Sequence, residues 1–198
     1  MGDSVLYVGR SIFFCKKGVL RWKIKLYAIN YRGGGKPILD PCCGSRMFWF
    51  DKNNPNVMFC DIREMETQAI WKSGNGKSVR TCEVKPDLVC SVTDLPFEDN
   101  TFWHIVFDPP HLLRLGDTSW LAKKYGKLTE DGWQDLIHDG FCECWRVLKP
   151  NGTLIFKWSE TDIKLSELLK VIPQKPLYGH RSGKHMTTHW MAFVKPEE

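Results

Sequence analysis

The stretch from Trp103 to His111 constrains the fold more than any other part of this sequence. Its apolar run, Ile-Val-Phe, is rich in the branched and aromatic residues of a fully buried strand. Asp108 follows directly, and because Pro109 and Pro110 cannot continue a sheet ladder, the strand must end there. The sequence therefore predicts a carboxylate at the carboxyl end of a buried strand, the edge where open parallel sheets bind ligands. A polar turn is the alternative for an Asp-Pro-Pro taken alone.

Three acidic residues upstream take the same position relative to short apolar segments that we expect to be strands. They are Asp40, Asp61 and Asp94. Asp61 comes 21 residues after Asp40, a spacing that places an acid to hold the ribose hydroxyls of a nucleoside. Four acids at four successive strand ends favour a binding site over four unrelated turns.

Strands and helical segments alternate along most of the chain. The strands are expected over 37–40, 57–61, 88–92, 103–107, 153–158, 177–180 and 189–194, the helices over 46–50, 63–72, 129–148 and 163–169, and polar or irregular loops over 74–86 and 112–128. This alternation predicts an α/β fold with a mostly parallel seven-stranded sheet, helices on both faces and a C-terminal antiparallel hairpin.

The front end of the chain differs from the rest in charge. Residues 1–36 hold eight Lys or Arg against one acid. Strict alternation of apolar and basic residues over 20–26 predicts a strand with its cations on one face, paired in a hairpin with a strand over 11–15. A helix over 20–30 is the competing interpretation. We therefore divide the chain into a basic arm, residues 1–35, and a domain, residues 36–198. The arm either neutralises phosphates or forms a solvated face.

Cysteine usage and hydropathy indicate the cellular setting. The eight cysteines form no C-x-x-C pair, which is poor spacing for zinc and no disulfide framework, so we expect reduced thiols and no metal. No apolar run approaches the ~18 residues of a membrane span, and we find no leader with a cleavage site. These observations predict a cytoplasmic protein that does not associate with a membrane.

Four stretches together resemble a known family. They are ILDPCCGSR at 38–46, the acid in FCDIR at 59–63, TDLPFEDNTFWHIVFDPPH at 93–111 and ECWRVLKPNGTLIF at 143–156. In this order they resemble the class I S-adenosylmethionine-dependent methyltransferases of the D-P-P-Y type, which methylate the adenine amino group, and in particular compact bacterial or phage DNA adenine methyltransferases. The first stretch is similar to the cofactor loop D-P-F-x-G-S-G and the third to the catalytic D-P-P-Y. The resemblance implies a Rossmann-like fold.

The resemblance implies a set of residues that bind S-adenosylmethionine. They are Asp40, Pro41, Cys42, Gly44, Asp61, Ile62, Asp94 and Leu95. Asp40 would lie near the methionine amino group and Asp61 would bind the ribose. Asp94 would accept a hydrogen bond from the adenine amine of the cofactor, and Leu95 would pack on that ring.

The resemblance also implies a catalytic group, formed by Asp108, Pro109, Pro110 and His111. The Asp108 carboxylate and the Pro109 carbonyl would accept hydrogen bonds from the target amine. This would concentrate the nitrogen lone pair for in-line attack on the sulfonium methyl, without a metal. Two positions depart from the family. His111 stands where a larger aromatic ring usually stacks on the base, and Arg46 stands where glycine is usual.

The implied activity is methylation of the exocyclic amino group of adenine in DNA. The alternatives are an RNA methyltransferase acting on an adenine or guanine amine, and a non-catalytic methyltransferase-like subunit that binds nucleic acid or a partner. Nucleic acid is the expected partner, with DNA favoured over RNA. Because no separate target-recognition domain is evident, we also consider a protein partner. A base in a duplex would have to be flipped out, which costs a few kcal/mol.

Overall fold

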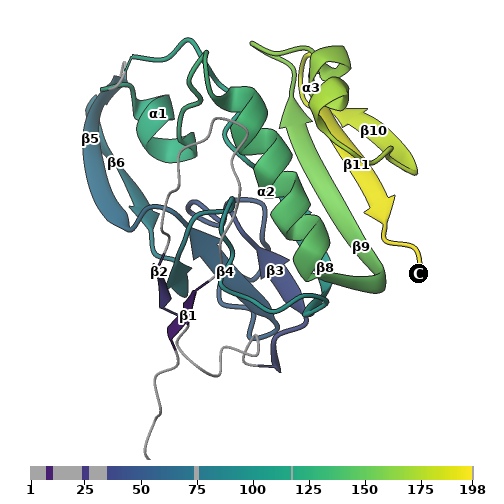
Figure 1. Ribbon diagram of the computed structural model, residues 1–198. Helices are drawn as coiled ribbons and strands as arrows, with labels where there is room; N and C mark the ends of the chain where they lie inside the picture. The colour runs from purple at the N-terminus through teal and green to yellow at the C-terminus, as the bar shows by residue number, and fades with distance from the viewer. Residues whose placement is uncertain (1–7, 11–23, 27–34, 74–75, 117, 198) are drawn as a thin grey trace, which may run out of the picture.

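A seven-stranded sheet organises the protein (Figure 1). The computed structural model describes residues 8–10, 24–26, 35–73, 76–116 and 118–197. The strands of the sheet are β3 (Ile38–Asp40), β4 (Val57–Asp61), β7 (Leu88–Val89), β8 (Phe102–Phe107), β9 (Leu148–Ser159), β10 (Tyr178–Ser182) and β11 (Thr188–Val194). Their order is β10-β11-β9-β8-β3-β4-β7. The sheet fits the Rossmann-like class I fold that the resemblance implies.

The direction of each strand agrees with the expectation from sequence. Strands β9, β8, β3, β4 and β7 pair in parallel. Strand β11 runs antiparallel to both β9 and β10, so β10 and β11 form the predicted C-terminal hairpin. Strand β9 begins at Leu148, earlier than predicted, because residues 149–152 continue the strand instead of forming a separate turn. An irregularity in the β8–β9 register between Phe102 and His104 accommodates them.

Two helices cover one face of the sheet. They are α2 (Trp133–Val147) and α3 (Leu165–Val171), and Figure 1 shows α2 lying along β8 and β9. The buried face of α2 packs Ile137, Phe141 and Cys144 into the main core. From β9, Phe156 and Trp158 enter the same core with no exposed surface. Truncating such a ring to alanine lowers the free energy of unfolding by about 3–5 kcal/mol. This packing therefore fixes the positions of β8 and β9.

The opposite face of the sheet departs from the prediction of helices on both faces. There Cys43, Val57 and Phe59 form a small second core with Ile38 and Trp49 beside them. The cover comes from turns over residues 41–56, and the helix expected over 46–50 is absent from them. Among the residues that the structure describes, both sheet-covering helices therefore lie on one face.

A hairpin replaces the helix expected over 63–72 and the loop expected over 74–86. Strand β5 (Met65–Ser73) pairs antiparallel with β6 (Gly76–Val84), in a register that joins Ser73 to Gly76. Burial along β5 alternates, because Met65, Thr67 and Ala69 are half-buried and the residues between them are exposed. The signal that the sequence analysis missed is the Gly-Asn pair at 74–75, a two-residue connection typical of hairpins.

The segment between β8 and α2 carries more order than a loop. Helix α1 (Trp120–Tyr125) lies within the region predicted as irregular, and the Ser119 hydroxyl caps it by accepting from the Leu121 N–H at 3.2 Å. Helix α2 begins at Trp133 and not at Thr129. Residues 130–132 form a turn instead, in which the Thr129 carbonyl accepts from the N–H groups of Gly132 and Trp133.

The N-terminal arm is described only in part. Strand β1 (Val8–Arg10) pairs antiparallel with β2 (Ile24–Leu26). The strand predicted over 11–15 and most of the one predicted over 20–26 lie outside the described residues, and the division at residue 35 stays a prediction. Among the described helices, none combines the length and apolar character needed to cross a membrane.

Candidate functional site

The four acids predicted at strand ends lie along one edge of the sheet. Asp40 and Asp61 are the last residues of β3 and β4. Asp108 follows β8 directly, and Asp94 lies five residues beyond β7. The four strands are neighbours in the order β8-β3-β4-β7 and run parallel. The expectation that acids stand at or directly past strand ends is confirmed for Asp40, Asp61 and Asp108. Asp94 lies further out than expected, because β7 ends at Val89 and the strand predicted over 88–92 is shorter.

Asp40 is the most deeply buried of these acids. Its side chain has no exposed surface. One carboxyl oxygen accepts from the Cys42 N–H at 3.3 Å and the other from the Trp49 indole N–H at 2.8 Å. Desolvation raises the pKa of Asp40 to about 7. The hydrogen bonds from Trp49 and Cys42 offset part of this rise, and the nearby charges of Asp108 and Asp61 add to it. A cation bound nearby would favour the ionised form of this carboxyl.

Asp61 ties the end of β4 to the turn that follows β3. Its Oδ2 accepts from the Gly44 N–H at 2.9 Å, and Gly44 has the positive φ of +49° that glycine tolerates best. Its Oδ1 accepts from the N–H and the Nε–H of Arg63 at 2.9 and 3.0 Å. The Arg63 guanidinium also donates to the carbonyl of Lys123 in α1 at 3.0 Å. A ribose that used Asp61 would therefore compete with Arg63.

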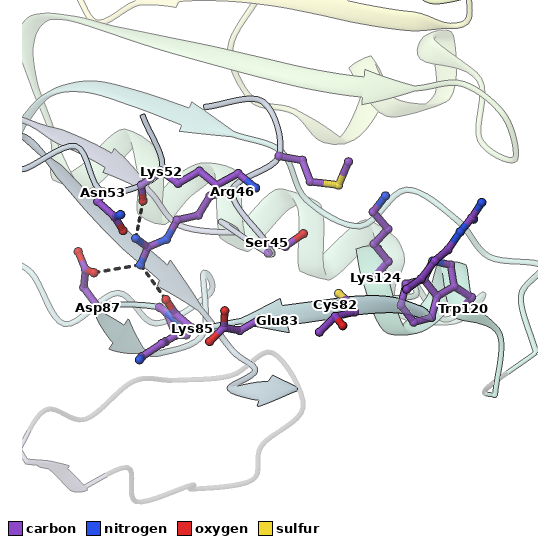
Figure 2. Close-up of a pocket in the computed structure, with 15 residues that line it drawn as sticks. Ser45, Arg46, Lys52, Asn53, Cys82, Glu83, Lys85, Asp87, Trp120 and Lys124 are labelled. Carbon is purple, nitrogen blue, oxygen red and sulfur yellow. Dashed lines mark hydrogen bonds and ion pairs between the residues drawn. The ribbon is translucent and has the colours of Figure 1, made fainter. Parts of the chain in front are cut away.

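Arg46 keeps the backbone geometry that glycine usually provides in such a turn. Its φ is +53°. Its side chain leaves the turn and donates to the carbonyls of Lys52 and Lys85 and to the carboxylate of Asp87 (Figure 2). The guanidinium lies 3.9 Å from the ring centroid of Phe59. These contacts hold the Arg46 guanidinium away from the backbone of the turn and link the turn to the segment after β6.

A cavity of about 260 Å³ lies between this turn and the end of β8. The turn contributes residues 42–45, the strand end contributes Asp108 and Pro109, and α1 contributes Lys124 and Tyr125. We call this space the Asp108 cavity. Desolvation raises the pKa of the Cys42 thiol well above its usual range and that of Cys43 to about 12, so both thiols are neutral at pH 7.

Lys157 is the site residue that the sequence analysis missed. It lies on β9, lines the Asp108 cavity, and its ammonium donates to Oδ2 of Asp108 at 2.5 Å. Parallel pairing of Phe107 with Phe156 places the next residues of the two strands side by side. The available signal was a lysine among alternating buried residues of an apolar strand, on the neighbour of the strand that ends in Asp108.

His111 borders the same cavity as a neutral ring. Desolvation lowers its pKa, and the partial offset from Asp108 does not reverse that shift. Its ring centroid lies 6.5 Å from that of Tyr125 and 6.2 Å from that of Trp158. Pro110, the remaining residue of the motif, contacts the end of α1, where a Cβ on Gly126 would lie 2.9 Å from the Pro110 ring.

The residues expected at the ribose and the adenine ring do not line the Asp108 cavity. Ile62 is 66% exposed beside the buried Asp61. Leu95 is 1% exposed and belongs to the main core, with its N–H donating to Glu143 at 2.9 Å. Its side chain therefore anchors the loop after β7 and presents no open face to a ring, contrary to the packing role expected of it. Asp94 is half-buried in that loop.

The structure thus brings together the turn after β3 and the Asp-Pro-Pro-His motif, and places the other predicted cofactor residues along the same edge but outside the cavity. Within the described parts of the chain, no group of three His, Cys, Asp or Glu side chains is placed to hold a metal ion.

No family model and no curated protein matches this chain. Solved structures do match. The chain is similar to the PH0226 protein of Pyrococcus horikoshii OT3, at 14% identity over 81% of each chain with a TM-score of 0.48. It is similar to the 1,6-didemethyltoxoflavin-N1-methyltransferase of Burkholderia thailandensis, solved with 1,6-didemethyltoxoflavin and S-adenosylhomocysteine, at 13% identity over 81% of this chain and 71% of that one, with a TM-score of 0.44. It is also similar to the antibiotic-resistance methyltransferase Kmr, at 10% identity over 82% and 90%, with a TM-score of 0.41.

Proposed function

We propose that this protein is an S-adenosylmethionine-dependent methyltransferase acting on the exocyclic amino group of adenine in DNA. The observation that carries the proposal is the shared cavity: Asp108 and Pro109, directly past β8, face the glycine turn that follows β3. The Asp-Pro-Pro-His sequence and the turn sequence are the two stretches that most resemble the family motifs.

The edge of the sheet suits a cationic, nucleoside-containing cofactor. Carboxylates at the ends of adjacent strands favour a sulfonium and an amino group over anionic ligands. The carboxylates of Asp61 and Asp108 are close enough to Asp40 to raise its pKa. Asp61 would hold the ribose hydroxyls after Arg63 moves aside, and the turn around Gly44 would pass close to the methionine portion. When bound, S-adenosylmethionine supplies an electrophilic methyl group.

The protein's own groups would position the target amine. Oδ2 of Asp108 accepts from Lys157, which leaves Oδ1 to accept from the amine. The Pro109 carbonyl would accept from the second N–H. These two acceptors would hold the nitrogen lone pair toward the methyl group, so catalysis rests on orientation and electrostatics. The neutral ring of His111 would pack against the base.

The proposal is tested by methyl transfer from labelled S-adenosylmethionine to single-stranded DNA, duplex DNA and total RNA. Wild type should label DNA. Asp108→Ala should lower the rate by about 100-fold or more, the scale of losing one preorganised polar contact to the reacting group. Asp108→Asn keeps one carbonyl acceptor, so its rate of methyl transfer should lie between those of wild type and Asp108→Ala.

Asp139→Asn is the matched control for that assay, because Asp139 is an exposed acid on α2 that pairs only with its neighbour His138 among the described residues. Labelling of RNA alone would move the activity to the RNA alternative. Equal labelling by wild type and Asp108→Ala would contradict the assignment of the catalytic carboxylate. Cofactor binding without labelling of any of these substrates would contradict the proposed substrate class.

A further inference from the structure

A second and larger cavity, with a volume of about 950 Å³, also lies against the glycine turn. One wall is the β6 strand and the segment after it, residues 80–87, and the other is the turn region that includes Ser45 and Lys52. Figure 2 shows Arg46 and Asp87 at one end of this space and Trp120 and Lys124 at the other. We call it the basic groove.

The charge of the basic groove is strongly one-sided. Its lining holds five basic residues, Arg46, Lys52, Arg80, Lys85 and Lys124, against two acids, Glu83 and Asp87. Asp87 is already engaged by Lys36 at 2.7 Å and by Arg46 at 3.1 Å. The exposed ammonium groups of Lys52 and Lys85 remain along the walls. This composition attracts an anion with charge distributed along its length.

The basic groove and the Asp108 cavity are parts of one path. Gly44, Ser45, Met47 and Lys124 line both. Helix α1 stands at the junction, because Trp120 at its start lines the groove and Tyr125 at its end lines the Asp108 cavity. A ligand held in the groove can therefore extend directly to the Asp-Pro-Pro-His motif.

Cations along a groove combined with an aromatic side chain are the chemistry that binds single-stranded nucleic acid, in which phosphates meet the cations and unpaired bases stack on rings. We propose that the basic groove holds the phosphate backbone of a single-stranded nucleic-acid segment that leads the target base into the Asp108 cavity. The proposal rests on the proposed function for the nature of the target, and it adds which residues would hold the polymer.

The test is binding of a fluorescein-labelled single DNA strand of about 15 nucleotides, measured by anisotropy at several salt concentrations without cofactor. The double variant Lys52→Gln/Lys85→Gln removes two groove charges and leaves the backbone carbonyls that Arg46 uses. It should bind roughly tenfold more weakly at low salt, and the slope of log affinity against log salt should fall by about 1.4, since each phosphate contact on a single strand contributes about 0.7.

Lys170→Gln/Lys175→Gln is the matched control, because it makes the same change of charge on exposed residues of α3 and the loop after it, away from the groove. It should leave affinity and slope near the wild-type values. Trp120→Leu provides an independent arm and should weaken binding by about fivefold or more while leaving the salt slope unchanged.

The outcomes separate this proposal from the proposed function. Equal losses in the two double variants, or no loss in either, would overturn the groove as the strand site even if the enzyme methylates DNA. Groove-dependent binding together with absence of methyl transfer would instead overturn the proposed function and leave the groove. An unmodified protein that does not bind the strand at low salt would also overturn the groove proposal.

Discussion

At the scale of single residues, each carboxylate at the sheet edge is held in a different way. Asp40 is buried between an indole and a backbone N–H, Asp61 pairs with Arg63, and Asp108 pairs with Lys157. The positions of these acids were predictable from sequence because strand ends can be recognised. Their partners Arg63 and Lys157 were not, because each pairing depends on strand register and on side-chain direction in three dimensions.

The burial of Asp40 predicts a pH dependence of stability. Its folded-state pKa is raised from 3.8 to about 7, so the folded protein keeps a proton that the unfolded chain releases. The stabilisation linked to this proton is fully present below the unfolded pKa and is lost as pH rises through 7. Between these values, the unfolding free energy of wild type should fall relative to that of Asp40→Asn by up to ~1.4 kcal/mol per pH unit.

Urea unfolding of both proteins at several pH values measures this difference. Asp139→Asn, which alters an exposed carboxyl, should follow wild type at every pH. Parallel pH profiles for wild type and Asp40→Asn would show that Asp40 is not protonated in the folded protein near neutral pH.

At the scale of elements, α1 and the β5–β6 hairpin shape the two cavities. The glycine turn and α1 each contribute residues to both cavities. Sequence reasoning found neither element. The helix is only six residues long, and in β5 the pair Met65 and Ala69 suits a helix spacing as well as a strand face. From sequence, the Gly-Asn pair at 74–75 is interpreted as the end of a helix, whereas it connects the two paired strands β5 and β6.

The contact between α1 and the Asp-Pro-Pro-His motif makes Gly126 a sensitive position. Its φ is +77° and its ψ 178°, a region open almost only to glycine, and an added Cβ would lie 2.9 Å from Cγ of Pro110. Gly126→Ala should therefore lower the free energy of unfolding by about 1–3 kcal/mol and reduce methyl transfer, because α1 must shift away from Pro110.

Gly116→Ala is the matched control for this variant, because it lies in the same segment between β8 and α2 and has no neighbouring atom within 4 Å of the added Cβ. Chemical denaturation of the two variants compares them directly. Equal stability of Gly126→Ala and Gly116→Ala would show that α1 is not docked on Pro110 in solution.

At the scale of the whole molecule, the strand order brings four separate sequence segments to one edge. Alternation of strands and helices was enough to predict the mostly parallel sheet and its reversed last strand. It was not enough to predict how the second face is covered, because residues 41–56 form turns that bury Cys43 and partly bury Trp49 without a regular apolar period. Both cavities are lined by these turns together with α1, and the larger one also by β6, so no single pattern in the sequence revealed the basic groove.

The proposed function requires this edge of the sheet to bind S-adenosylmethionine through Asp61 and the glycine turn. Calorimetric titration of the wild-type protein with S-adenosylmethionine tests it most directly, with Asp61→Asn and Asp139→Asn in parallel. Asn at position 61 can still accept from the Gly44 N–H, so the turn should be retained.

We expect one binding site in wild type and the same affinity in Asp139→Asn. The affinity of Asp61→Asn should be weaker by about tenfold or more, the scale of one hydrogen bond to a charged group. Absence of binding by wild type would contradict the proposed function, and equal affinity of wild type and Asp61→Asn would contradict the role of Asp61.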